Sequence, residues 1–80
     1  MIQVHLEKSN SLKINSSVEL EKGDWELINL FGKLIAKGTI KKITTSLGIE
    51  IKNCVAGTYY LVIYSGEKII QTPVQIGERD

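Results

Sequence analysis

The most constraining feature of this chain is the alternation of apolar residues in the segments between Trp25 and Ile63. Apolar side chains there recur at every second position, as at Tyr59, Leu61 and Ile63. This period puts successive side chains on opposite faces of a strand, whereas a helix needs a period of about 3.6 residues. Short segments with glycine and asparagine separate the alternating ones and are typical of turns. The pattern predicts two hairpin-forming pairs of strands, within 25–40 and within 49–63.

The same period extends toward both ends of the chain. Ile2, Val4 and Leu6 share one parity, and the segment 58–65 is apolar on both faces, which is typical of a central strand. Ile, Val and Thr supply 22 residues against two Ala, and β-branched residues favour strands over helices. We therefore expect a single all-β domain over residues 1–80. Its fold is predicted to be a small immunoglobulin-like antiparallel β-sandwich of about seven strands.

Four local expectations follow from turn and strand chemistry. A bend or bulge at the serines 16–17 should let Val18 and Leu20 resume the inward alternation. Residues 21–24 should form a hairpin loop in which Gly23 takes a positive φ. Gly38 is a candidate bulge. Pro73 lacks an N–H group for the ladder, so the last strand should lie at a sheet edge or carry a bulge.

The charge balance excludes a typical nucleic-acid binder. Ten Lys and Arg residues face nine Asp and Glu residues, and the single arginine is Arg79. A nucleic-acid partner would require a basic field rich in arginine. A loose basic stretch (Lys33, Lys37, Lys41, Lys42) is interpreted as a solvated face or as lysine protection of an edge strand. A weak site for an anionic partner is the alternative.

No arrangement of residues points to catalysis, a metal or a cofactor. His5 is the only histidine, and its parity places it on the solvent face. Cys54 is the only cysteine, so it cannot form an internal disulfide, and we interpret it as a small buried hydrophobe, with a reactive thiol as the alternative. Asp24, Glu26 and Glu50 could approach one another, but paired carboxylates act as acid and base only inside a cleft. We therefore do not expect this protein to be an enzyme.

Two aromatic residues leave a choice open, whereas a third, Trp25, is expected to lie in the core. Tyr60 and Tyr64 lie on the second face of the central strand, and are either packed under other strands or part of an exposed contact surface.

Two short motifs carry a resemblance to a known family. One is the segment 29–33 (Asn-Leu-Phe-Gly-Lys), and the other is the segment 54–59 (Cys-Val-Ala-Gly-Thr-Tyr). With them, the chain from about residue 9 to residue 76 resembles the C-terminal sorting domain of type IX secretion cargo from Bacteroidetes. The residues that match the motifs are Asn29, Gly32, Lys33, Gly57 and Tyr59. The chain differs from the family at its ends, since Asn10 is not followed by proline and the tail ends Glu-Arg-Asp.

The resemblance implies a non-catalytic recognition module. Such domains are β-sandwiches that a protein component of the outer-membrane translocon recognises, without cofactor or nucleic acid. Docking would use loops or an edge strand, and an unpaired edge invites strand addition. We expect the last strand to be the docking edge, through Lys68, Ile70, Thr72, Pro73 and Val74.

The residues leave a second hypothesis open, a small structural subunit of a larger assembly such as a phage capsid or a surface appendage. Residues 1–7 lie outside the resemblance and could pair with a neighbouring chain. No apolar stretch has the length of a membrane span, and residues 1–10 do not resemble a signal peptide. A fragment of a sorted cargo would be secreted or at the cell surface. A chain with Met1 as its native start would be cytoplasmic or part of a virion.

Overall fold

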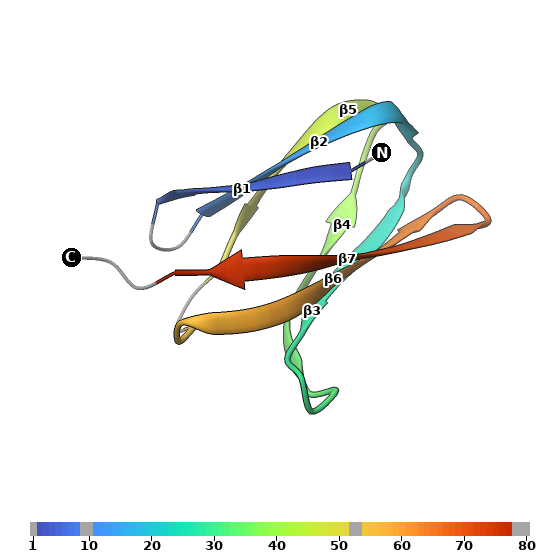
Figure 1. Cartoon of the computed structure of the whole chain (residues 1–80). Coiled ribbons are helices and arrows are strands. Elements are labelled where there is room, and N and C mark those ends of the chain that lie inside the picture. Colours follow the sequence, from blue (N-terminus) through green and yellow to red (C-terminus); the bar gives the residue numbers. More distant parts are fainter. Residues whose placement is uncertain (1, 9–10, 52–53, 78–80) are drawn as a thin grey trace.

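Seven strands form the fold (Figure 1). The structure is a computed structural model that describes residues 2–8, 11–51 and 54–77, with residues 6–8 as backbone only. The strands are β1 (Ile2–Lys8), β2 (Ser11–Leu20), β3 (Gly23–Ile28), β4 (Leu34–Ile40), β5 (Thr44–Glu50), β6 (Gly57–Ser65) and β7 (Lys68–Ile76). The predicted all-β class and strand number are confirmed.

The strands make two antiparallel sheets that pack face to face (Figure 1). One sheet has the order β1-β2-β5 and the other the order β4-β3-β6-β7. Hairpins join β1 to β2, β3 to β4 and β6 to β7, and the other three connections cross between the sheets. The predicted sandwich is therefore confirmed. The predicted hairpin within 49–63 is wrong, because β5 and β6 lie in different sheets.

The core lies between the two sheets and is built from alternate residues of the strands. Trp25 and Leu27 of β3 point into it, as do Ile49 and Ile51 at the end of β5, as predicted. The central position of β6 between β3 and β7 is also confirmed. The buried cluster comprises Leu12, Ile14, Leu20, Trp25, Leu27, Ile40, Ile49, Ile51, Tyr59, Leu61, Ile63, Val74 and Ile76.

The predicted bend in β2 is present, but its consequence for Val18 was wrong. The pairing of β2 with β5 loses register between Asn15 and Leu20. The Ser16 hydroxyl accepts a hydrogen bond from the Val18 N–H at 3.2 Å and donates one to the Val18 carbonyl. This local turn breaks the alternation. Val18 is therefore 54% exposed, whereas Leu20 is buried.

The connection between β2 and β3 is a crossover and not the predicted hairpin loop. The Glu21 N–H, the first in this connection, donates a hydrogen bond to the buried Ser65 hydroxyl at 2.7 Å. This bond holds the connection against the four-stranded sheet. Gly23 has no positive φ. It pairs with both Ile40 and Ser65, and a Cβ there would overlap the Tyr64 carbonyl oxygen. Close backbone approach, and not turn geometry, requires this glycine.

Gly38 is not the predicted bulge. Gly38 pairs with Trp25 in regular register, and the irregularity of the β3–β4 ladder lies between Leu27 and Ile28. A Cβ at Gly38 would lie 2.6 Å from three atoms of the Trp25 indole. The glycine therefore makes room for the indole ring. The predicted edge position of β7, with Pro73, is confirmed.

Candidate functional site

The two motif segments meet at one end of the sandwich, which we call the tip (residues 29–33 and 54–58). The β3–β4 hairpin closes there after the pair Ile28–Leu34, and β6 begins there at Gly57. Between the two loops lies an open hollow of about 300 Å³. It is lined by Asn29, Leu30, Phe31, Ile35, Val55, Ala56, Gly57, Thr58 and Tyr59.

The first loop is held by the side chain of Asn29. Its Oδ1 accepts hydrogen bonds from the N–H groups of Phe31 and Lys33, each at 2.9 Å. The backbone adds bonds from the Gly32 N–H to the Asn29 carbonyl and from the Asn29 N–H to the Lys33 carbonyl, each at 3.0 Å. Gly32 has a φ of 83°, which favours glycine. An Asn or Asp followed three residues later by Gly is therefore what this turn requires.

The second loop is tied to the core by Tyr59. Its ring is buried, and its hydroxyl donates a hydrogen bond to the Val55 carbonyl at 2.6 Å. Burial raises the pKa of Tyr59, so the hydroxyl keeps its proton and its donor role. Gly57 has a φ of 152°, which again favours glycine. Gly57 thus lets the chain turn into β6, and Tyr59, two residues later, holds the loop through its hydrogen bond to the Val55 carbonyl.

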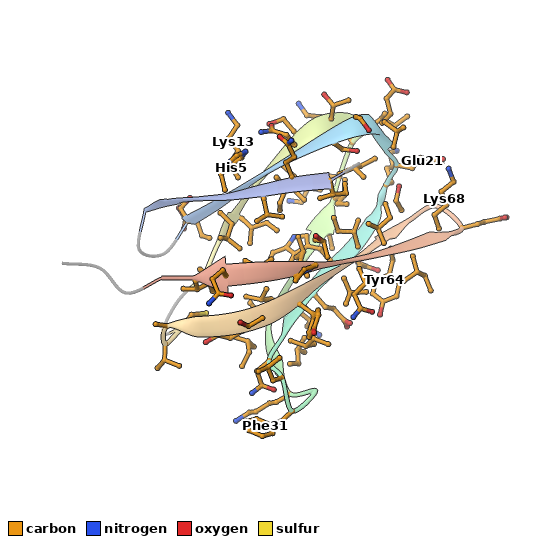
Figure 2. All side chains as sticks on the ribbon, in the orientation of Figure 1. His5, Lys13, Glu21, Phe31, Tyr64 and Lys68 are labelled. Carbon is orange, nitrogen blue, oxygen red and sulfur yellow. The ribbon has the colours of Figure 1, made fainter. Side chains whose placement is uncertain are left out.

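The tip exposes large apolar side chains. Phe31 is 94% exposed, Val55 76% and Leu30 62%. Figure 2 shows Phe31 projecting from the far end of the β3–β4 hairpin. Hydrogen bonds within the loop fix its backbone, and the apolar side chains of Leu30 and Phe31 lie in solvent. Exposed apolar groups gathered in one place make the tip a candidate contact surface.

The structure brings the five motif residues together at this end. Asn29, Gly57 and Tyr59 line the hollow, and Gly32 and Lys33 complete the turn beside it. Their local roles are to shape the two loops. Sequence patterns alone did not predict the apolar side chains between them as site residues. The available signal was two large hydrophobic residues inside a turn, where polar residues are usual.

The residues proposed as a docking edge lie along β7, the last strand of its sheet. Val74 is buried in the core and Ile70 packs against it, so both side chains face inward. Lys68 and Pro73 are exposed, and Thr72 is half-buried. Docking here would therefore use the backbone edge of β7, and it stays a prediction.

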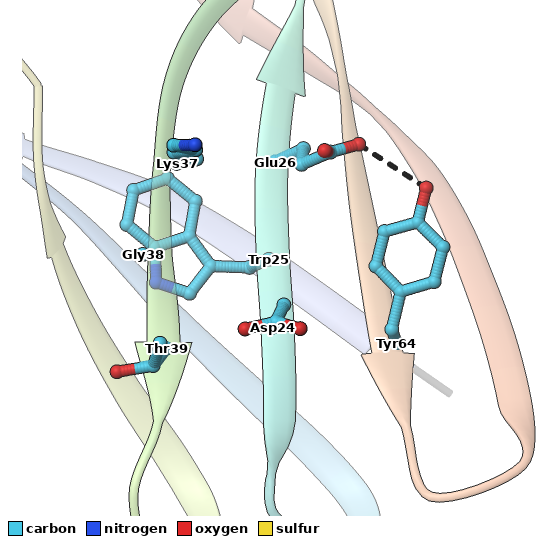
Figure 3. Close-up of a pocket in the computed structure, with 7 residues that line it drawn as sticks. All are labelled: Asp24, Trp25, Glu26, Lys37, Gly38, Thr39 and Tyr64. Carbon is cyan, nitrogen blue, oxygen red and sulfur yellow. Dashed lines mark hydrogen bonds between the residues drawn. The ribbon is translucent and has the colours of Figure 1, made fainter.

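A second hollow of about 550 Å³ lies on the outer face of the four-stranded sheet (Figure 3). Tyr64 donates a hydrogen bond to Glu26 Oε1 at 3.1 Å. This bond and the negative charge of Glu26 raise the pKa of Tyr64. Asp24 lies beside Glu26 on β3, whereas Glu50 belongs to the other sheet, so the three carboxylates do not converge. Tyr60 and Tyr64 are half-buried on this outer face.

The remaining candidates of the sequence analysis lie apart from one another. His5 is exposed on the three-stranded sheet (Figure 2), as predicted. Cys54 is only partly buried against the core, and this burial raises the pKa of its thiol. The lysines of the basic stretch are exposed on or beside β4, an edge strand. Within the described ranges, no group of His, Cys, Asp and Glu could hold a metal ion.

The described part of the chain has no helix long and apolar enough to cross a membrane. Comparison with known families gives a match over residues 8–76 to the secretion system C-terminal sorting domain. No curated protein matches the chain.

Proposed function

This chain belongs to the secretion system C-terminal sorting domain family, and from that membership we propose that its tip is the surface on which a protein of the secretion machinery docks. Domains of this family are non-catalytic tags that mark a protein for type IX export. Such a tag acts by being recognised by another protein. The observation that carries the proposal is the exposure of Leu30, Phe31 and Val55 on the two loops that hold the family motifs.

The tip is pre-organised for binding. The Asn29 side chain fixes the first loop through two hydrogen bonds, and Tyr59 fixes the second loop through the Val55 carbonyl. A rigid loop loses little conformational freedom when a partner binds, so more of the contact energy appears as affinity. Aromatic anchors such as Phe31 frequently dominate interfaces. The hollow between the loops offers space for an apolar side chain of the partner.

The size of the effect follows from the burial of Phe31. Moving a phenylalanine from solvent to a fully buried site contributes about 1.5–3 kcal/mol. Because the side chain is 94% exposed in the free protein, nearly all of this becomes available on docking. Phe31→Ser should therefore weaken docking by roughly 10- to 100-fold and leave folding almost unchanged.

Secretion of a reporter tests the proposal. The chain is fused to the C-terminus of a reporter enzyme in a bacterium with a type IX system, and the exported fraction is measured. Phe31→Ser should lower export strongly. The matched control is Ile43→Ser, since Ile43 is also an exposed apolar residue (56%) but lies in the β4–β5 connection, away from the tip. Equal export of both variants, at equal stability, would contradict docking at the tip.

The structural-subunit hypothesis stays as an alternative. Residues 2–8 pair with β2 of the same chain, which occupies one edge of β1 and leaves the other for a neighbour. Light scattering on the isolated chain separates the two functions. A recognition module should be a monomer, and a defined oligomer would favour the subunit.

A further inference from the structure

The outer edge of β7 has two unequal halves because of Pro73. Pro73 pairs with Tyr60 but has no N–H to give, so this pair cannot be a hydrogen-bonded one. In an antiparallel pair, hydrogen-bonded and non-hydrogen-bonded residues alternate. Ile69, Gln71 and Gln75 share the parity of Pro73, and their backbone groups therefore point away from β6.

The first half of this edge is the open one. At Ile69 and Gln71 both the N–H and the carbonyl face outward, which is the pattern that another strand can join. At Pro73 only the carbonyl remains, so a ladder that starts at Ile69 ends there. Ile69 is also 68% exposed, although it is a large apolar residue.

A hollow of about 340 Å³ adjoins the same half. Its lining consists of Ile2, Ser16, Val18, Ile70, Gln71 and Thr72. It lies where the edge strands β1 and β7 of the two sheets come near each other. The turn at Ser16 that exposes Val18 supplies one of its apolar walls. The hollow thus combines an apolar wall with unpaired backbone groups.

We infer that this part of β7, residues 69–72, binds an extended segment of a partner protein by strand addition. The added strand pairs with Ile69 and Gln71, and its one inward-facing residue, an apolar one, fills the hollow between Ile2, Val18 and Ile70. Apolar walls favour an apolar side chain, and the backbone groups require an extended segment. Only the identity of the partner, a protein of the secretion machinery, rests on the proposed function.

A second copy of this chain fits the edge less well. Antiparallel pairing of two β7 edges centred on Gln71 would set Pro73 of each copy opposite Ile69 of the other. Each copy would then lose one hydrogen bond of a very short ladder. A partner segment without proline makes all of these bonds.

The test uses the full chain and a synthetic peptide, acetyl-Lys-Thr-Thr-Leu-Thr-Thr-Lys-amide. Binding is followed by NMR shifts of the backbone amides and by contacts between the Leu methyls and Val18. We expect shifts at Ile69 and Gln71. Gln71→Pro removes an outward N–H that β6 does not use, so it should keep the fold and weaken binding about tenfold. Pro73→Thr restores an outward N–H and should strengthen binding.

Four results would overturn the inference. The first is a peptide with central Asp that binds as well as the one with central Leu. The second is the same affinity for the native chain and the folded Gln71→Pro variant. The third is amide shifts confined to the tip. The fourth is a chain that dimerises through residues 69–72, because the occupant would then be a second copy. Failure here leaves docking at the tip standing, since Phe31→Ser tests that surface separately.

Discussion

Gly23→Ala should be among the most damaging small substitutions in this protein. Gly23 lies between β4 and β6, and a Cβ at this position would overlap the carbonyl oxygen of Tyr64. That oxygen belongs to the backbone of the central strand, so it cannot move away as the end of a flexible side chain could. Relief requires β3 and β6 to separate locally, which weakens their ladder.

The expected loss can be set against the whole stability. Overpacking that displaces side chains and backbone typically costs about 1–3 kcal/mol and occasionally more, and the cost should lie at the upper end here because the overlapped atom is a backbone oxygen. We therefore expect Gly23→Ala to lower the free energy of unfolding by about 3 kcal/mol or more. A chain of this length has about 4–12 kcal/mol in total. At about 4–8 °C per kcal/mol, Tm should fall by roughly 12–24 °C.

Gly48→Ala is the matched control. A Cβ at Gly48 meets no heavy atom within 4 Å, and its φ is not positive. This variant should stay within about 0.5 kcal/mol of the native chain, with a small gain from the restricted unfolded state. Urea unfolding followed by Trp25 fluorescence measures both variants. The reasoning is refuted if Gly23→Ala is as stable as the native chain, or if Gly48→Ala is equally damaging.

Three further predictions concern the tip and the outer face. Tyr59→Phe loses the bond to the Val55 carbonyl and should cost about 1 kcal/mol in urea unfolding, and an unchanged midpoint would contradict that bond. Asn29→Ala should cost about 1–2 kcal/mol in the same assay, whereas Asn29→Asp keeps the acceptor oxygen; equal losses would argue against the turn geometry. Because the pKa of Tyr64 is raised in the folded state, the folded protein keeps its proton longer. The free energy of unfolding should therefore decline above about pH 10, and less steeply in Tyr64→Phe. Identical pH profiles of the two proteins would refute this.

The strands could be predicted from the sequence because burial on one face enforces a period of two. Leu61 and Ile63 are fully buried on one face of β6, as the alternation indicates. The position of β7 also followed from local chemistry, because a proline cannot donate to a ladder. Such features depend on neighbours along the chain, and sequence patterns report them well.

The predictions from sequence failed at residues whose role is set by contacts with distant parts of the chain. Gly23 and Gly38 read as turn or bulge residues, yet the Tyr64 carbonyl and the Trp25 indole require them. Val18 follows the alternation in the sequence, but the Ser16 hydroxyl turns the backbone and exposes it. The tip could be only half predicted. The motifs identified Asn29 and its neighbours, but the proximity of this loop to the second loop depends on sheet topology.

Docking at the tip is tested most sharply by site-specific crosslinking during export. A photoreactive phenylalanine analogue replaces Phe31 at the tip in one fusion, and His5 on the exposed face of the other sheet in a second. The crosslinked proteins are then identified by mass spectrometry. If the tip is the docking surface, position 31 should crosslink to a protein of the secretion machinery and position 5 should not. Crosslinks to that protein from position 5 alone, or from both positions equally, would contradict docking at the tip.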